Sequence, residues 1–389
     1  MDGAQFAKML SDKHLFELSR MEYKYSPASV KEFCDLLRQN FAQSLPLDDF
    51  FQKELFYLPN LAQISTNGMK QLLSAPAAGQ PFGLQAMTEE IHATFQIESI
   101  HSTRNSIRHI LNGYAPRDEQ EERIYGMKRG LEFIANPQNM ITEENLHHLY
   151  QISTEAYLPA EDRLLPGRFY RHDDVFIVGG EEARKGMPAP QLANAMKRLV
   201  DFANAQDGIN ELHKAAILHF AFAYYHPYFD GNGRTARLLH LWYLVQQGYS
   251  AALFTPFSRY IAESKGNYYK AYEQIEKNAL ISGCTDVTPF LSYFCKEVYN
   301  RLQTAATPPK SDFKIYQTAL AEGKITEKER LLWEYVLSAY GAEEFTTKQL
   351  EKDFGNAAYA TIRAFVLKFS AMGLFSARKT GNRVFYHVG

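Results

Sequence analysis

Two long apolar segments lie close together in the middle of this 389-residue chain. They span residues 211–225 and 234–247 and are apolar on nearly every side, a pattern typical of helices that cross the interior of a domain. Gly248 follows the second segment, where glycine commonly ends a helix. The pattern predicts two buried helices joined by a short polar loop.

In the rest of the first 300 residues, apolar positions mostly recur at helical spacing. Residues 1–90 show this period, broken by short loops such as residues 44–49 (SLPLDD) and 74–83 (SAPAAGQPFG), and predict a helical N-terminal region. Residues 91–302 form a second, mostly helical region. The fold class that follows is mainly α.

One stretch of the second region favours strands instead. Two β-prone runs, residues 168–171 and 175–178, flank His172-Asp173-Asp174 and predict a hairpin with its turn there. A lone hairpin in a helical domain either covers something or connects two helices at the surface, and the spacing leaves both interpretations open.

The last part of the chain differs in character. Residues 303–312 are small, polar and proline-bearing, which is typical of a linker, and we expect the linker to span residues 303–323. In residues 324–389, Thr326 and Glu329 form a capping box that opens a helix, two further helices follow, and β-prone runs around Gly381-Asn382 predict a hairpin. This order resembles a winged helix-turn-helix domain.

Composition and charge narrow the class of protein. Hydrophobic residues make up 46% of the chain, charged residues 22%, and the formal net charge is −2, so we expect a globular protein without a membrane surface or a chain-wide nucleic-acid surface. Residues 346–389 nevertheless hold seven Lys or Arg against two acids, a local basic patch.

The cysteines and the N-terminus suggest a reducing compartment. Cys34, Cys284 and Cys295 lie far apart, so neither a zinc site nor a disulfide framework is expected. No apolar run is of signal-peptide type or long enough to span a bilayer, and we expect a cytoplasmic protein.

The polar loop carries the chemistry. In HPYFDGNGRTAR, residues 226–237, the run Gly231-Asn232-Gly233 removes bulk where a helix begins, so backbone N–H groups can converge on an anion. Arg234 and Arg237 lie three residues apart on one helix face and extend that site. A polyphosphate is the ligand that needs so many donors.

Two further residues of the loop suggest a reaction. Asp230 would repel phosphate alone but becomes useful with Mg²⁺, which bridges carboxylate and phosphate oxygens. His226 has the pKa of a general base near neutral pH. The loop therefore predicts a site for a magnesium–nucleoside triphosphate with a base that activates a hydroxyl.

The same stretch resembles the Fic family signature, HPFx[DE]GNGRxxR, with Tyr228 in place of phenylalanine. The resemblance extends over roughly residues 90–300. GRFYR…VFIVGG, residues 167–180, is similar to the family's flap hairpin, and SRYIAESKGNYYKAY, residues 258–272, is similar to the segment that closes the adenine pocket.

The resemblance implies an all-helical Fic core that transfers AMP from ATP to a Ser, Thr or Tyr hydroxyl of a target protein, with Mg²⁺, and releases pyrophosphate. It assigns His226 as general base, Asp230 as Mg²⁺ ligand, Gly231, Asn232, Gly233, Arg234 and Arg237 as phosphate ligands, Tyr268 as adenosine contact, and Ile177, Val178 and Gly179 as the flap edge that pairs with a strand of the target.

Upstream, Thr94-x-x-x-Glu98 resembles the family's inhibitory motif, [ST]xxxE[GN], with Ser99 at the last position. The resemblance implies a helix near residues 90–100 whose Glu98 pairs with Arg237 and fills the space of the γ-phosphate. From the residues alone, Glu98 could also be an exposed helix residue.

Three functional hypotheses follow: an auto-inhibited protein adenylyltransferase, an enzyme that uses Glu98 to remove AMP from a modified protein, and a DNA-binding or protein-binding regulator that acts through the C-terminal domain. His219 lies two helical turns, roughly 10 Å, from His226, so it cannot share one ion with it and is expected to be a hydrogen-bonded core histidine.

Overall fold

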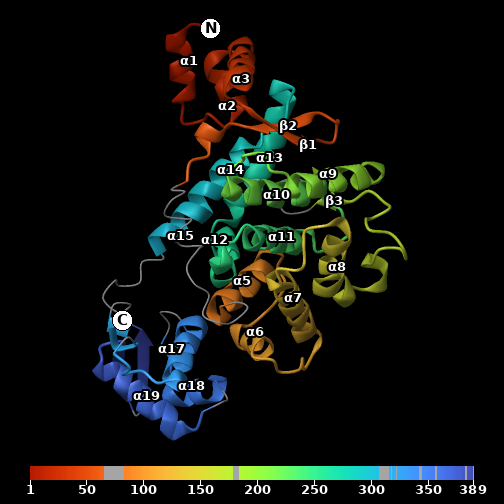
Figure 1. Ribbon diagram of the computed structural model, residues 1–389. Helices are drawn as coiled ribbons and strands as arrows, with labels where there is room; N and C mark the ends of the chain where they lie inside the picture. Colours follow the sequence, from red (N-terminus) through yellow and green to blue (C-terminus); the bar gives the residue numbers. More distant parts are fainter. Residues whose placement is uncertain are drawn as a thin grey trace.

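The computed structural model describes every residue except 65–82, 178–183, 306–314, 317, 321, 341–343, 355–356, 382 and 389. Helices dominate the described part of the chain, which also holds three two-stranded antiparallel sheets (Figure 1). The predicted mainly helical fold is confirmed. Among the described residues, no helix has the length and apolar character needed to span a membrane.

The N-terminal region contains three helices and a hairpin. Its elements are α1 (Gly3–Leu10), α2 (Leu18–Tyr25), α3 (Pro27–Phe41), β1 (Gln43–Asp48) and β2 (Glu54–Tyr57). The prediction of a loop at residues 44–49 is wrong, because this stretch lies in β1 and pairs with β2. Leu45 and Leu47 alternate with exposed neighbours and are fully buried, a strand period that the proline between them obscures.

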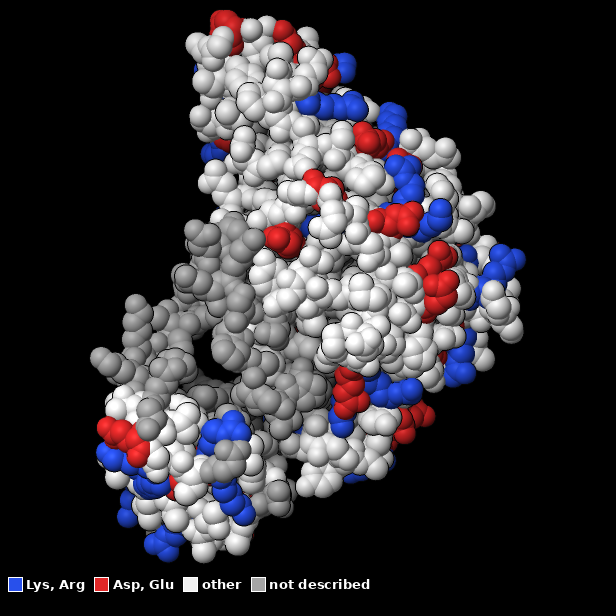
Figure 2. Space-filling model, viewed as in Figure 1, with Lys and Arg blue, Asp and Glu red and all other residues white. Residues whose placement is uncertain are grey.

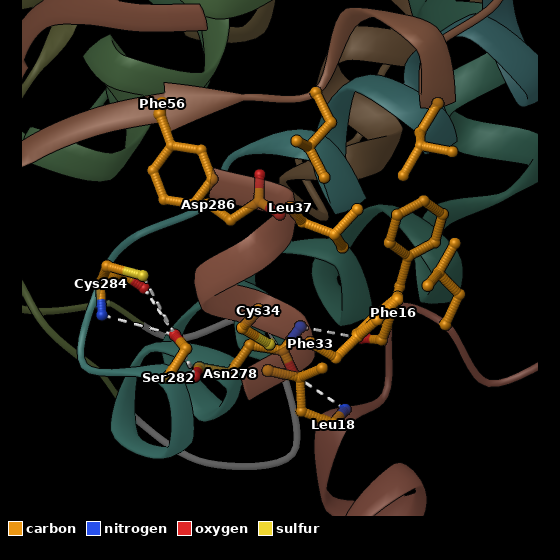
Figure 3. A pocket seen from close by; sticks show the side chains of 13 residues that line it. Phe16, Leu18, Phe33, Cys34, Leu37, Phe56, Asn278, Ser282, Cys284 and Asp286 are labelled. Atoms are coloured by element: carbon orange, nitrogen blue, oxygen red, sulfur yellow. Dashed lines mark hydrogen bonds between the residues drawn. The ribbon is translucent and has the colours of Figure 1, made fainter. Parts of the chain in front are cut away.

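A separate apolar cluster holds helices α1 to α3 together, with Phe33 and Met21 fully buried in it. A small cavity of about 40 Å³ lies between this cluster and the end of α13 (Lys265–Ser282) (Figure 3). Cys34 and Cys284 line it as free thiols, and Cys295 is also free. Burial raises the pKa of Cys34 to about 12, which keeps this thiol unreactive.

The centre of the molecule is built around α10 (Glu211–Tyr225) and α11 (Asn232–Gln246), which pack side by side (Figure 1). α10 has the predicted bounds, and nearly every residue of both helices is buried. The helices around them are α5 (Leu84–Ile97), α6 (Arg104–Leu111), α7 (Glu119–Ala135), α8 (Glu143–Ser153), α9 (Leu192–Asn204), α12 (Phe257–Glu263), α14 (Thr288–Tyr293) and α15 (Asn300–Ala305).

Helix α5 is fixed firmly beside α11 and α12. The buried carboxylate of Glu90 accepts hydrogen bonds from the backbone N–H of Ser258, at 2.7 Å, and from its hydroxyl. Glu89 pairs with Arg104, whose Nη2 lies 2.8 Å from Oε2. Because α5 begins at Leu84, one helix runs across the domain boundary predicted at residue 90.

The C-terminal part has the predicted order of three helices and a hairpin. These are α17 (Glu327–Ala339), α18 (Thr347–Phe354), α19 (Tyr359–Ala371), β5 (Phe375–Thr380) and β6 (Arg383–Val388). Thr326 and Glu329 form the predicted capping box, and Gly381, at φ 59°, lies between the two paired strands. The winged-helix assignment itself stays a prediction.

Candidate active site

The loop between α10 and α11 lies between two residues with left-handed backbone. His226 caps the C-terminus of α10 at φ 56°, and Gly231 caps the N-terminus of α11 at φ 78°. A Cβ at Gly231 would also lie only 2.2 Å from Cγ2 of Thr154. α11 begins two residues earlier than predicted, so Asn232 and Gly233 form its first turn rather than part of the loop.

The side chain of Asn232 explains this earlier start. Its Oδ1 accepts the N–H of Tyr228 at 2.9 Å and its Nδ2 donates to the C=O of Tyr228 at 2.8 Å. The amide therefore ties the loop to the helix with both of its polar ends. Its buried side chain thus shapes the loop, and the expected contact of Asn232 with phosphate stays a prediction.

His226 is arranged as a neutral base. Its Nδ1 lies 3.4 Å from the C=O of Ala223, which only accepts, so Nδ1 carries the proton and Nε2 keeps its lone pair. The pKa of His226 is lowered to about 4, mainly because the ring is buried. The nearby cations of Arg171 and Arg184 contribute to this lowering, and their effect outweighs the rise caused by Asp230. The imidazole is therefore neutral at pH 7 without any activation step.

Arg171 holds the backbone at His226. Its Nε donates to the C=O of His226 at 2.7 Å, Nη1 donates to the C=O of Asp173 at 2.6 Å, and Nη2 donates to the C=O of Met187. Its own N–H donates to the C=O of Pro227 at 2.9 Å. Arg171 is almost fully buried, and burial lowers its pKa. One guanidinium thus fixes both the histidine and the start of the flap.

Glu98 lies against both arginines of α11. Its Oε2 accepts from Nε of Arg234 at 2.7 Å, and its Oε1 accepts from Nη2 of Arg237. Arg237 also donates from Nε to the hydroxyl of Thr94. The carboxylate sits on the first turn of α11, since a Cβ at Gly233 would lie 2.7 Å from Oε1. The predicted pairing of Glu98 with Arg237 is present, and the contact with Arg234 is additional.

Both guanidiniums are deeply buried at this contact. The side chains of Arg234 and Arg237 are each 3% exposed, and that of Glu98 is 19% exposed. Burial disfavours the charge on Arg234, but Glu98 and Asp230 outweigh that effect and raise its pKa. Two buried cations therefore share one carboxylate as their main counter-ion.

The position after Glu98 needs an unusual backbone. Glu98 caps the C-terminus of α5, and Ser99 follows at φ 59°. Glycine and asparagine adopt this left-handed region with least strain, which gives a physical reason for the Gly or Asn of the inhibitory motif. Ser99 adopts the same conformation, so its departure from the motif does not change the chain path.

Asp230 fits a magnesium ligand bridged by phosphate. Its Oδ1 accepts the N–H of Gly231 at 2.6 Å, and its Oδ2 lies 3.0 Å from Nη2 of Arg234. Its side chain is 52% exposed and lines the cavity. Among the described residues, no group of three metal-binding side chains gathers. One carboxylate suits Mg²⁺, which commonly takes its other ligands from substrate phosphates and water.

The cavity above the loop has a volume of about 480 Å³. Its lining residues are His226, Asp230, Gly231, Asn232, Gly233, Arg237, Glu98, Ile177 and Tyr268, together with Ile97, Ser99, Phe176, Arg184, Ala223, Lys265, Tyr269 and Tyr272. The predicted base, phosphate loop, inhibitory glutamate, adenosine contact and flap edge thus converge on one space.

Tyr268 lies at the buried wall of this cavity. Its hydroxyl lies 3.0 Å from Nε2 of His219 and 3.4 Å from the hydroxyl of Tyr272. Burial lowers the pKa of His219 well below its usual value, with His240 adding to the effect, so His219 is neutral. His219 is the hydrogen-bonded core histidine that was predicted.

The predicted hairpin of residues 168–171 with 175–178, turning at residues 172–174, is wrong, because the second of these runs pairs with a later strand. β3 (Phe176–Ile177) pairs with β4 (Arg184–Lys185), whereas residues 168–171 form no strand. The hydrogen bonds of Arg171 to loop carbonyls take this stretch into the core. Ile177 lines the cavity, and Val178 and Gly179 lie outside the described residues.

Sequence reasoning missed three contributors to the site. Arg171 lies within the GRFYR stretch that is similar to the family's flap hairpin, so its position next to the flap could have been inferred from the sequence. Arg184 follows the predicted hairpin and carried no signal of its own. The contact of Glu98 with Arg234 could have been inferred, because Arg234 and Arg237 share a helix face.

Comparison with known proteins agrees with this geometry. Residues 140–244 match the family model described as "Fic/DOC family". Protein adenylyltransferase Fic of Drosophila willistoni is 26% identical over 177 residues, 42% of this chain and 33% of that protein. A probable protein adenylyltransferase of Aquifex aeolicus is 30% identical over 146 residues, 33% of this chain and 45% of that protein. The chain thus spans less than half the length of these relatives.

Among solved structures, a Fic family protein from Desulfovibrio desulfuricans G20 aligns with a TM-score of 0.48 and 17% identity, over 78% of this chain and 86% of that one. The family match spans α8, α9 and α10, nearly all of α11, and the whole polar loop with His226 and Asp230. Over residues 140–244 this chain is therefore similar to the Fic/DOC family.

Proposed function

We propose that this protein is an auto-inhibited protein adenylyltransferase, which transfers AMP from ATP to a Ser, Thr or Tyr hydroxyl of a target protein. One observation carries the proposal. The Glu98 carboxylate occupies an anion seat made by the first turn of α11, Arg234 and Arg237, beside a neutral His226. A phosphate group needs the same donors as this carboxylate.

The reaction requires one proton acceptor and one leaving group. Nε2 of His226 takes the proton of the target hydroxyl as its oxygen forms a bond to the α-phosphorus of ATP. The bond from that phosphorus to the bridging oxygen breaks, and pyrophosphate leaves. Arg234 and Arg237 are the cations that stabilise the charge on the departing phosphates once Glu98 has moved away.

Asp230 would hold Mg²⁺, whose chemistry is to bridge phosphate oxygens and neutralise their charge. Its neighbours suit that role, because Oδ1 already takes the Gly231 N–H while the exposed side chain faces the cavity. The Gly233 position, free of a Cβ, allows phosphate to approach the helix backbone closely.

The inhibition follows from competition for the same donors. Glu98 pairs with both guanidiniums, and a triphosphate that reached them would meet its carboxylate. Since α5 is tied to α12 through Glu90, moving Glu98 requires a change at the end of α5 rather than a side-chain rotation in solvent.

A reverse reaction remains the second candidate. Glu98 and His226 line the same cavity, so Glu98 is placed where it could also activate a water that removes AMP from a modified protein. The two directions differ in what Glu98→Gly does: it activates transfer in the first and abolishes AMP release in the second.

The C-terminal domain carries the third candidate. Figure 2 shows lysine and arginine side chains gathered over it. Two of them are already paired: Arg378 with Glu344 at 2.6 Å and Lys368 with Glu329 at 2.8 Å. DNA or protein binding there stays a hypothesis, which a salt-dependent gel shift with the full chain tests.

The test of the main proposal uses two forms of labelled ATP. The Glu98→Gly protein is incubated with Mg²⁺, a cell lysate and ATP labelled either on the α-phosphate or on the γ-phosphate. Label is counted above that of the same lysate without the protein, because the lysate's own kinases transfer γ-phosphate. We expect this added label from the α-phosphate only, with pyrophosphate released. Added label from the γ-phosphate would indicate a kinase and contradict the proposal.

Two histidine variants complete the experiment. His226→Ala in the same background should reduce labelling by about a hundredfold to ten-thousandfold, the usual contribution of a general base. His213→Ala is the matched control, because His213 is also a histidine of α10. Its ring forms a hydrogen bond with the C=O of Ala62 and does not line the cavity. Near-normal labelling by His226→Ala would contradict the assignment of His226 as the general base.

A further inference from the structure

A second arginine lines the cavity beside Arg237 and comes from the flap. Arg184 in β4 lines the same space as His226. Its side chain is 12% exposed. Neither the loop motif nor the phosphate assignment accounts for it.

Arg184 is bound to α13 by two contacts. Its Nη1 lies 3.1 Å from Oε1 of Glu276, and its guanidinium carbon lies 5.2 Å from the centre of the Tyr272 ring. Glu276 and Tyr272 are one helical turn apart on α13, so both present themselves to one guanidinium. The geometry is that of a side chain pinned to a helix rather than one reaching for a ligand.

The flap depends on such an anchor because its own ladder is short. β3 and β4 share two residue pairs, Phe176 with Lys185 and Ile177 with Arg184. A two-stranded ladder of this length is not stable by itself in water. Since Arg184 is the partner of Ile177, fixing Arg184 fixes the position of Ile177 at the cavity.

The anchor also reaches the nucleotide side. Arg184 stacks on Tyr272. The hydroxyl oxygen of Tyr272 lies 3.4 Å from the hydroxyl oxygen of Tyr268 at the buried wall. Tyr268 in turn contacts His219. A continuous set of contacts therefore links the flap strand with the wall assigned to adenosine.

We propose that Arg184 is a positioning residue that latches β4 to α13 through Glu276 and Tyr272 and thereby holds Ile177 of β3 in place for a target strand. The role of the flap in binding a target strand rests on the proposed function. The contacts of Arg184 with α13 do not depend on whether AMP transfer occurs. Arg184 acts through Ile177 and does not touch phosphate.

Amide hydrogen exchange on the full-length protein tests the latch without any target. We expect Arg184→Ala and Glu276→Gln each to speed exchange at the amides of the flap strands, residues 176–177 and 184–185, by at least about fivefold. Because the two residues act on each other, the double variant should exchange no faster than about twice the faster single one. Arg184→Lys keeps the ion pair and should give an intermediate rate.

Lys185→Ala is the matched control. Lys185 neighbours Arg184 but pairs with Asp174 in solvent, with side chains 56% and 45% exposed. It should leave exchange within about twofold of the wild-type rate. Unchanged exchange in Arg184→Ala, or an equal effect of Lys185→Ala, overturns the latch.

Nucleotide binding separates the latch from a phosphate-binding role. The affinity for Mg-ATP, measured by calorimetry, should change less than about threefold in both Arg184→Ala and Glu276→Gln. A large loss of ATP affinity in Arg184→Ala alone would make Arg184 a phosphate ligand and contradict the proposal. If AMP transfer is never found but flap exchange responds as expected, the latch stands and the proposed function fails.

Discussion

The two ends of the cavity are built very differently. At the phosphate end, Glu98, Arg234 and Arg237 are held on two long, well-packed helices, and the two guanidiniums are nearly inaccessible. At the flap end, a two-residue ladder presents Phe176, 70% exposed, to solvent. The tightly packed end suits a ligand of constant shape, such as a triphosphate. The short ladder at the flap end suits a target protein that pairs with it as an additional β-strand.

The difference predicts very unequal costs for the same glycine substitution. Gly231→Ala at the phosphate end adds a Cβ 2.2 Å from Thr154 at φ 78°, and we expect it to lower the free energy of unfolding by about 4 kcal/mol. Gly167 near the flap has φ 77° but nothing within 4 Å, so Gly167→Ala should cost about 1 kcal/mol, for backbone strain alone. Chemical denaturation measures both, and equal losses would contradict the comparison.

Acid should weaken the protein through His226, which lies between the two ends. The folded-state pKa is about 4 and the unfolded value about 6.5, so the unfolded chain binds the proton first. Stability is therefore fully present above pH 6.5 and is lost as pH falls towards 4, by up to about 3 kcal/mol from this group.

His226→Asn isolates that contribution, since His219 and His240 also have lowered pKa values. The variant should lose less stability than the wild type between pH 7 and pH 4. Transfer activity of Glu98→Gly should likewise keep its base until well below pH 6.5. An acid limb of the rate profile centred near pH 6.5 would show that His226 is not buried during catalysis.

Removing Glu98 should destabilise the nucleotide-free protein and spare the nucleotide-bound one. Glu98→Gln leaves Arg237 without a carboxylate and Arg234 with Asp230 alone, and it should cost about 2 kcal/mol, discounted for its partial exposure. Mg-ATP should then raise the melting temperature more than it does for the wild type. Glu132→Gln, which breaks a 3.7 Å pair between Lys128 and a half-exposed glutamate, is the control and should change neither quantity. Loss that ATP does not recover would place Glu98 outside the anion seat.

Ser99→Gly should have the smallest effect and the opposite sign. Glycine adopts φ 59° without the strain that serine carries, so the folded state gains up to about 1 kcal/mol, less the added freedom of the unfolded chain. The melting temperature should therefore rise or stay unchanged while transfer stays inhibited. A clear fall would indicate that the Ser99 side chain itself supports the inhibitory contact.

Much of this site could be predicted because its signals are local. The apolar periods of α10 and α11, the glycines between them and the charges beside them lie within forty residues of sequence. Glu98 could be paired with Arg237 only through a family resemblance, since 139 positions separate them. Arg184 with Glu276 had no such guide, because 92 positions separate them and neither belongs to a motif.

The misplaced strands have a similar cause. In β1, a proline hides the alternation of Leu45 and Leu47, and pairing with β2 supplies the missing support. At the flap, residues 168–171 have strand propensity, but the hydrogen bonds of Arg171 with the loop decide their path. Tertiary contacts outweigh local propensity in both places.

The central claim is that Glu98 holds the place of the γ-phosphate. Calorimetric affinities of wild type and Glu98→Gly for ATP and for AMP, with Mg²⁺, test it most directly, because AMP lacks the group that competes with Glu98. We expect Glu98→Gly to increase the ratio of ATP to AMP affinity by at least about tenfold, equivalent to about 1.4 kcal/mol. Equal changes for the two nucleotides, or no change for ATP, would contradict the account.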